Sequence, residues 1–183
     1  MRPPIRVTAP AAPPVSLAEV KQHLRVDFDA EDALTLGYLA AAVAHLDAWA
    51  GILGRCMVSQ AWRQDFDRFE SCLRLPFPDA SGAVIKYFDA HENEIEVSSS
   101  DYNVHEDARG AIITLKSGKS WPSVGETRPS VSVTANYGFG TDSDVPAALK
   151  SAILMHVQSL YERDANPALM RAHDALIAPY RRI

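Results

Sequence analysis

The stretch V-S-L-A-E-V-K-Q-H-L-R-V-D at residues 15–27 decides where ordered structure begins in this chain. Ser16 and Glu19 have the S-x-x-E spacing of a capping box. In that motif the serine hydroxyl accepts from the N–H three residues on, and the glutamate reaches back to the serine N–H. Apolar residues then repeat at helical spacing, namely Leu17, Val20 and Leu24. We therefore predict a short helix over 17–24.

The segment before this helix is rich in proline. Residues 1–15 contain Pro3, Pro4, Pro10, Pro13 and Pro14. Because proline restricts the backbone and lacks an N–H donor, such a stretch favours extended structure and cannot build a core. We expect an extended arm over 1–15 that is mobile alone or held by a neighbouring chain.

A second helix is expected after the acidic stretch 26–32. Asp29 is the predicted N-cap, and the acids after it favour the first helical turn. The helix is predicted to run to about Ala50, where two glycines follow. Its predicted apolar face comprises Leu34, Tyr38, Ala41, Ala42, His45 and Trp49, with Leu39, Val43 and Leu46 beside them.

From Cys56 to Gly140 the hydrophobic pattern shortens toward a period of two, with turn residues between the runs. A Pro-Phe-Pro sequence after Leu75 ends one strand there or confines it to an edge. The predicted strands are 58–66, 73–75, a hairpin of 83–88 with 94–97, a hairpin of 102–104 with 111–115, and a last strand that begins with Val131, Val133 and Ala135 and ends in Tyr-Gly-Phe-Gly at 137–140.

Helical spacing returns after Gly140. Asp144-Val145-Pro146 has the form of a helix start, a cap followed by proline in the first turn, and this helix is expected to reach Tyr161. Asn166-Pro167 opens a last helix, which ends at Ala178-Pro179.

The order helix, helix, strand block, helix, helix places the chain in the α+β class. Helices split between the two chain ends pack most simply as one helical bundle, with the strands inserted as an antiparallel β subdomain. The expected divisions are an arm at 1–15, the first part of the helical core at 16–54, a β-rich insertion at 55–143, the second part of the core at 144–178 and a tail at 179–183.

Charge is distributed unevenly along the 183 residues. The net charge is −5, with +2 on residues 1–15, +2 on residues 165–183 and −9 on the remainder. A net negative chain argues against a nucleic-acid grip, which depends on clustered Lys and Arg. Basic ends on an acidic body suggest that the ends reach acidic surfaces on other chains; two solvated tails are the alternative.

The two cysteines, Cys56 and Cys72, could in principle form a bridge, but reduced buried thiols are expected. No apolar run reaches the length of about 18 residues typical of a membrane helix, and the N-terminus has no long apolar segment. We predict neither a membrane helix nor a signal peptide.

Tests for catalytic and metal-binding patterns are negative. The six histidines include no H-E-x-x-H or H-x-H pair, and His91–Glu94 and His105–Asp107 are interpreted as solvated turns. Gly138-Phe139-Gly140 is not followed by the third glycine of a dinucleotide fingerprint and is expected to be a turn leaving the sheet. We predict no catalytic residue, no cofactor and no metal.

Two further residue groups have both a functional and a structural interpretation. Asp27, Asp29, Glu31 and Asp32 could bind a cation, but their spacing differs from an EF-hand loop and helix capping explains them. Trp49, Trp62 and Trp121 could stack on bases, but without basic neighbours they are expected to anchor a core or an interface.

An ordered series of segments resembles the head–tail connector (adaptor) proteins of tailed phages, a family also found in prophages and gene transfer agents. The segments are S-L-A-E-V-K-Q-H-L-R-V-D at 16–27, Q-A-W at 60–62, L-R-L-P at 73–76, S-D-Y-N-V at 100–104, W-P at 121–122, V-S-V-T-A-N-Y-G-F-G at 131–140, D-V-P-A-A-L-K-S-A-I-L at 144–154 and L-I-A-P-Y-R-R at 176–182. Together they span nearly the whole chain in order.

The resemblance implies a non-enzymatic virion structural protein at the head–tail junction. It implies a homo-oligomeric ring of about twelve copies that extends the DNA channel of the portal protein. DNA would pass through the lumen without specific binding, and a tail-side stopper or tail terminator protein would bind the other side. Assembly would occur in the cytoplasm of the producing bacterial cell, with no membrane.

In such proteins the C-terminal end commonly docks into the portal. Here the corresponding residues are Pro179, Tyr180, Arg181, Arg182 and Ile183, and the two arginines could pair with acidic portal groups. The alternative from the residues alone is a small stand-alone ligand-binding or enzyme domain that uses its β-rich face.

Overall fold

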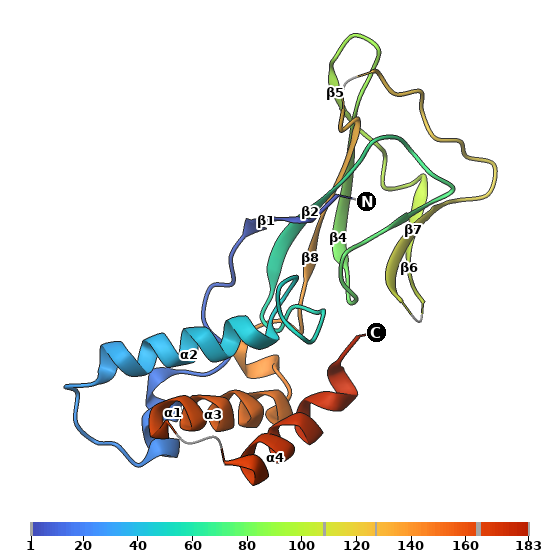
Figure 1. The fold of residues 1–183 in the computed structure, drawn as a ribbon. Coiled ribbons are helices and arrows are strands. Elements are labelled where there is room, and N and C mark those ends of the chain that lie inside the picture. Colours follow the sequence, from blue (N-terminus) through green and yellow to red (C-terminus); the bar gives the residue numbers. More distant parts are fainter. Residues whose placement is uncertain (1, 108, 127, 164–165, 183) are drawn as a thin grey trace. The chain divides into compact units, whose positions relative to one another are not determined.

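The computed structural model describes residues 2–107, 109–126, 128–163 and 166–182. The chain forms two compact units (Figure 1): a strand unit of Met1–Ala9 with Ser59–Gly138, and a helical unit of Pro10–Val58 with Phe139–Ile183. The predicted α+β class is confirmed.

The helical unit is built from the elements α1 (Leu17–Leu24), α2 (Asp32–Leu46), η1 (Asp142–Asp144), α3 (Ala147–Glu162), α4 (Pro167–Ile177) and η2 (Ala178–Tyr180). Helix α3 packs against α1, α2 and α4. One apolar cluster joins these elements, comprising Val15, Val20, Leu39, Ala42, Leu46, Leu53, Met57, Val58, Val145, Leu149, Ala152, Ile153, Val157 and Ile177.

Helix α1 has the predicted bounds and the predicted capping box. The Glu19 N–H donates to the Ser16 hydroxyl at 3.2 Å, and the Ser16 N–H donates to the Glu19 carboxylate at 2.7 Å. These hydrogen bonds to Ser16 lower the pKa of Glu19, because they favour the charged carboxylate. The helix ends at Arg25, whose φ of 59° is left-handed.

The prediction that Asp29 caps α2 is wrong. The N-cap is Glu31, and the Asp29 carboxylate instead accepts from Lys21 Nζ at 2.6 Å. Asp32 accepts from the same ammonium group at 2.8 Å. Lys21 thus draws two acids of the 26–32 stretch into an ion pair, which accounts for them without a bound cation.

Helix α2 also ends four residues before the predicted position, at Leu46. The backbone turns away at Asp47, whose carboxylate accepts from the Met57 N–H at 2.7 Å. The loop that follows returns to the helix end, where the Leu53 N–H donates to the Leu46 carbonyl at 3.2 Å. These contacts satisfy groups that a longer helix would have used internally.

The predicted apolar face of α2 is only partly the buried face. The side chains buried against the unit are Thr35, Leu39, Ala42 and Leu46. Leu34 and Trp49, which were predicted to lie on the apolar face, are 45% and 51% exposed. Helix α2 is apolar around most of its circumference, so hydrophobic spacing alone could not identify the side that packs inward.

The later helices largely follow the prediction. Asn166 caps α4 as expected, but Asp144 does not cap α3. Its carboxylate accepts from the Thr141 N–H at 2.8 Å and so closes the short η1 turn, while Pro146 occupies the N-cap of α3.

The strand unit contains two antiparallel sheets. The first has the order β1-β2-β8-β4-β5 and the second the order β3-β7-β6. Their strands are β1 (Ile5–Thr8), β2 (Gln60–Phe66), β3 (Cys72–Arg74), β4 (Ser81–Phe88), β5 (Glu94–Glu96), β6 (Tyr102–Asp107), β7 (Gly110–Leu115) and β8 (Val131–Tyr137). Both predicted hairpins are confirmed, and β3 is an edge strand as expected.

Two expectations for this unit are wrong. The Pro-rich arm forms strand β1, in which Ile5 pairs with Arg63 and Arg6 with Trp62 of the same chain. His105–Asp107 lies in β6 and is not a turn, because the hairpin closes between Asp107 and Gly110. Residues 5–8 therefore form a strand because they pair with the edge of β2 in the same chain.

None of the helices in the described ranges has both the length and the apolar content to cross a lipid bilayer.

Candidate functional site

The C-terminal segment is positioned by α4. The Asn166 side chain accepts from the N–H groups of Ala168 and Leu169 at 3.0 and 3.3 Å, and Pro167 restricts the first turn. At the other end, Ile177 is buried in the apolar cluster. The chain then enters η2 and the tail from a fixed position on the helical unit.

Contacts beyond α4 hold the tail against the helical unit. The Arg182 N–H donates to the Leu53 carbonyl at 3.0 Å. The Tyr180 ring packs edge-on against Phe139, with centroids 6.4 Å apart. The Arg55 guanidinium lies 4.4 Å from the centroid of the same Phe139 ring, a favourable cation–π arrangement. The tail therefore has a defined path.

The loop that receives the tail contains a glycine at the point of closest approach. Gly54 has a φ of 62°, and a Cβ built on it would lie 3.4 Å from the Cβ of Arg182. A larger residue would be strained in this backbone conformation and would press on the tail.

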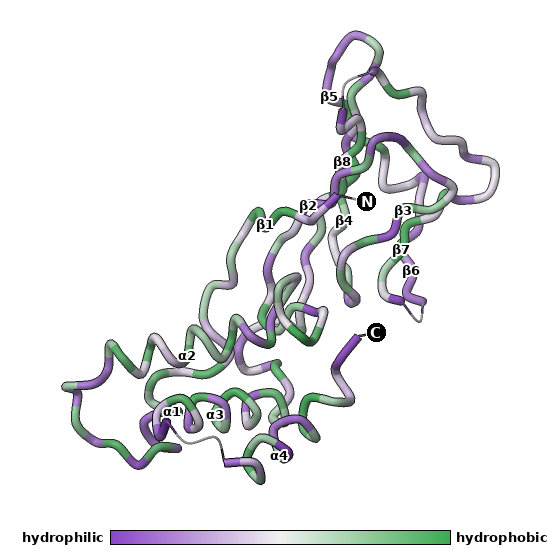
Figure 2. The backbone as a smooth tube through the Cα atoms, viewed as in Figure 1, coloured by the Kyte–Doolittle hydropathy of each residue, from purple (hydrophilic) through white to green (hydrophobic). Residues whose placement is uncertain are grey.

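The structure places four of the five residues predicted to contact a portal. Pro179 and Arg181 are exposed, Tyr180 and Arg182 are half-buried, and Ile183 lies outside the described residues. The hydrophilic end of the chain is visible in Figure 2. Arg181 is thus the most accessible cation of this segment, and the portal contact stays a prediction.

Three histidines from three helices meet in the helical unit, which the sequence analysis did not foresee. The ring centroids of His45 and His156 are 4.9 Å apart, those of His156 and His173 5.5 Å, and those of His45 and His173 6.5 Å. His173 is 1% exposed, and its Nδ1 lies 3.0 Å from the Asp174 carboxylate. The residues are too far apart in sequence for local spacing to reveal them.

Burial lowers the pKa of His156, and its neighbours His45 and His173 lower it further because their protonated forms would repel its charge. The lowered pKa favours the neutral form of the His156 imidazole. Among the residues that the structure describes, no group of three or more His, Cys, Asp or Glu side chains is placed to hold a metal ion.

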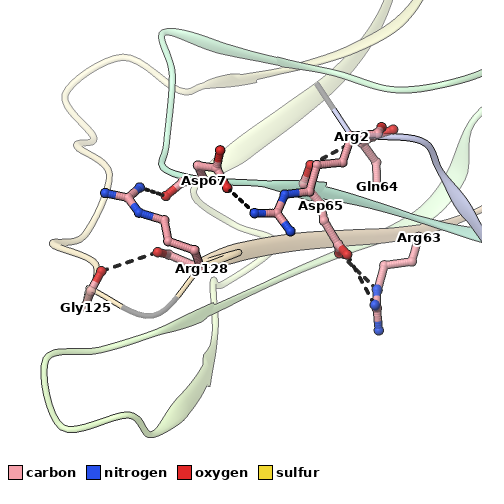
Figure 3. A network of polar contacts seen from close by, with 8 residues as sticks. Arg2, Arg63, Gln64, Asp65, Asp67, Gly125 and Arg128 are labelled. Atoms are coloured by element: carbon pink, nitrogen blue, oxygen red, sulfur yellow. Dashed lines mark hydrogen bonds and ion pairs between the residues drawn. The ribbon is translucent and has the colours of Figure 1, made fainter.

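The strand unit has a polar cavity of about 270 Å³, lined by Arg2, Asp65, Phe66, Asp67, Arg68, Glu70 and Arg128. Figure 3 shows its network: Arg2 pairs with the Asp67 carboxylate at 2.9 Å, and the Arg128 guanidinium donates to the Asp67 carbonyl at 2.5 Å. Arg63 pairs with Asp65 at 2.9 Å. The network therefore holds the segment before β1 and the residue Arg128 against the end of β2.

The three tryptophans differ in their surroundings. Trp62 is buried and packs edge-on against Phe77, with centroids 5.2 Å apart. Trp121 stacks on Phe69 at 4.5 Å. Trp49 is exposed at the end of the α2 segment. Two of the three therefore anchor packing in the strand unit, and no aromatic platform for bases is formed by these three.

Cys56 is a buried thiol and Cys72 a half-buried thiol, and neither forms a disulfide. They lie in different units of the chain.

The family described as "Phage gp6-like head-tail connector protein" matches residues 14–112 of the chain. The matched range includes α1, α2 and the larger part of the strand unit. A search of the curated proteins gives no match.

Solved structures of gene transfer agent (GTA) particles are similar to the whole chain. The neck of an empty GTA particle computed with C6 symmetry and the neck of a native GTA particle computed with C12 symmetry each contain a chain of 25% identity, with a TM-score of 0.78. Each alignment covers 100% of this chain and 96% of the other. The virion of a native GTA particle contains a similar chain of 24% identity, with a TM-score of 0.75 and coverage of 98% and 95%.

Proposed function

Because the chain belongs to the phage gp6-like head–tail connector family, we propose that copies of it form a closed ring that joins the capsid portal to the tail. The chain is a structural adaptor of the virion. The main support for a ring is that the full chain, both units included, aligns with a protein from a GTA neck of C12 symmetry. A ring of about twelve copies would fit that symmetry.

The proposed mechanism is geometric and needs no catalysis. A contact between two different surfaces, repeated by a constant rotation, closes a ring around an axial channel. The helical unit, with helices from both chain ends, would act as the bundle that builds the ring. The β-rich insertion would contact a tail-side stopper or tail terminator protein.

The net charge of −5 suits a channel that DNA must traverse. Retention of duplex DNA depends on Lys and Arg that replace counterions along the phosphates. An acidic subunit lacks that excess, so we expect DNA to pass the lumen without specific binding. Assembly would take place in the cytoplasm of the producing bacterial cell, before the particle is complete.

We place the portal contact at Pro179, Tyr180, Arg181, Arg182 and Ile183. Support comes from the anchoring of the tail: the Arg182 backbone bonds to Leu53 and the Tyr180 ring packs on Phe139. A tail held in this way presents the exposed Arg181 in one place, which lowers the entropy lost on binding. Acidic portal groups would pair with its guanidinium.

The test is complex formation with the portal protein of the same genome, followed by sedimentation. The wild-type chain should give a ring-on-ring complex, and deletion of 179–183 should abolish it. Arg181→Glu should weaken portal binding at least tenfold, because it reverses the charge of an exposed side chain without touching the core. Arg25→Glu, at another exposed arginine of the helical unit, is the matched control and should bind as the wild type does.

If the truncated chain binds the portal as tightly as the full chain, the tail is not the portal contact. If the wild-type chain forms no complex with the portal at all, the connector function itself is contradicted.

A further inference from the structure

Helix α2 presents an uncharged apolar face to solvent. Leu34 and Leu36 are 45% and 46% exposed. Exposed small residues lie beside them on the same side of the helix, namely Ala33, Gly37, Ala40, Ala41 and Ala44. We call these seven residues the α2 face. Figure 2 shows how little of this helix is hydrophilic.

A solvent-facing side of a helix ordinarily carries charged residues, whereas a helix that is apolar all round is buried. In the single chain the α2 face is neither charged nor buried. Contiguous exposed apolar surface marks interaction sites, and the centres of interfaces are depleted of charge. We therefore expect the α2 face to bind a partner surface that is largely apolar at its centre.

A second surface of the helical unit is also rich in small exposed residues, with the exposed Arg171 beside them. Ala168, Ala172 and Ala175 are exposed and recur at helical spacing on the outer side of α4, opposite the buried His173 and Ile177. We call this side the α4 face. Helix α3 packs against both α2 and α4, so the two faces are on different flanks of the same unit (Figure 1).

Shape favours contact between the two faces. Small side chains let two helices approach to an interaxial distance of about 8 Å. The leucines of the α2 face would then lie over the alanines of the α4 face, and the exposed Arg171 would lie at the edge of the contact.

Charge favours the same pairing over contact between two α2 faces. Residues 21–50 carry a net −3, from five acids against Lys21 and Arg25, whereas residues 166–182 carry +2 from Arg171, Arg181 and Arg182 against Asp174. Two α2 segments would repel each other through their acids. An α2 segment and an α4 segment would attract.

We propose that the α2 face of one copy packs against the α4 face of the next copy, so that one contact repeated around the axis closes the ring. The proposal rests on the proposed connector function and names the surfaces through which the ring forms. Contact between unlike faces is what closure requires, since a contact between identical faces ends at a dimer.

The direct test is disulfide trapping in the ring assembled with the portal. Ala40→Cys and Ala172→Cys are introduced together in a Cys72→Ser background, and the ring is oxidised. Facing Cα atoms within about 7 Å can be bridged. The expected product is a ladder of covalent oligomers that reaches the full ring. A mixture of the two single variants should stop at dimers, and each single variant alone should give no product.

Dimers from Ala40→Cys alone would show α2 against α2 and overturn the proposal. A ring that assembles with the double variant and gives no covalent product on oxidation would also overturn it.

Leu36→Glu tests the same contact by charge. The side chain is exposed in the single chain, so the variant should keep the circular dichroism of the wild type. It should need at least tenfold more protein to form rings, because the glutamate would be buried in the contact. Val104→Glu, at a position 38% exposed in β6, is the control and should form rings normally.

If Leu36→Glu forms rings at wild-type concentrations, the α2–α4 contact is contradicted and the connector function is not. A wild-type chain that forms no ring with the portal would contradict the connector function, and the contact with it.

Discussion

The helical unit and the strand unit both bury apolar side chains, but they differ in how charge is distributed over their surfaces. The helical unit buries one continuous apolar cluster and leaves the α2 face without charge. In the strand unit, ion pairs join sheet neighbours and edges, such as Arg74 with Asp107 at 2.7 Å and Lys86 with Glu94 at 2.7 Å. The strand unit also exposes apolar side chains, namely Ile5, Val7, Ile95 and Val104, but the α2 face gathers its apolar residues on one helix without a charge among them, and there we expect copies to meet.

The largest difference in stability between the two units is expected from Leu149→Ala. Leu149 is fully buried on α3, and removing its side chain should leave a cavity in the helical unit at a cost of about 2–5 kcal/mol. Thermal unfolding followed by circular dichroism should show the helices melting earlier. The fluorescence of Trp62 and Trp121, in a Trp49→Phe background, should report an unchanged strand unit.

The two units would be one cooperative structure, and the comparison would fail, if the tryptophan signal shifted together with the helical signal.

A smaller effect is expected from Ser16→Ala, which removes the hydroxyl of the capping box. Loss of an N-cap costs about 1 kcal/mol. The midpoint of chemical denaturation of the helical unit should fall accordingly, measured by circular dichroism. Ser98→Ala, at a serine of the strand unit outside any helix, is the control. An unchanged midpoint for Ser16→Ala would mean that packing alone defines α1.

The smallest effect is a pH dependence confined to the helical unit. Burial lowers the pKa of His156 below its usual value of 6.5, so the unfolded chain binds the proton more readily than the folded one. Stability from this group is present above about pH 6.5 and is lost as the pH falls through that value toward the lower, folded-state pKa. The wild type should melt at a lower temperature at about pH 5.5 than at about pH 7.5.

His156→Gln should reduce this difference, and His91→Gln, in an exposed turn of the strand unit, should not. An equal pH dependence in the wild type and in His156→Gln would show that the histidine cluster does not govern it. The imidazoles of His45 and His173 face His156, and Asp174 faces His173.

Local signals predicted the fold well where they were self-contained. The capping box at Ser16 and Glu19 predicted α1, and Asn166-Pro167 predicted the start of α4, because a cap depends on residues three or four apart. Alternation predicted β2, because a half-buried strand repeats every second residue.

Structural features that depend on residues far apart in the sequence could not be predicted from local patterns. The pairing of β1 with β2 joins residues about sixty positions apart. Asp29 does not cap α2 because its carboxylate pairs with Lys21 of α1. The histidine cluster and the path of the tail along Leu53 arise only once the helices pack. The inward side of α2 was ambiguous because most of its circumference is apolar, and that same property is the reason why we propose it as an assembly surface.

The most direct test of the central claim is the mass of the wild-type chain with and without its portal, measured by native mass spectrometry. A connector predicts one discrete complex in which about twelve copies accompany each portal. A chain that stays monomeric in the presence of the portal, or that binds without forming a ring, would contradict the account.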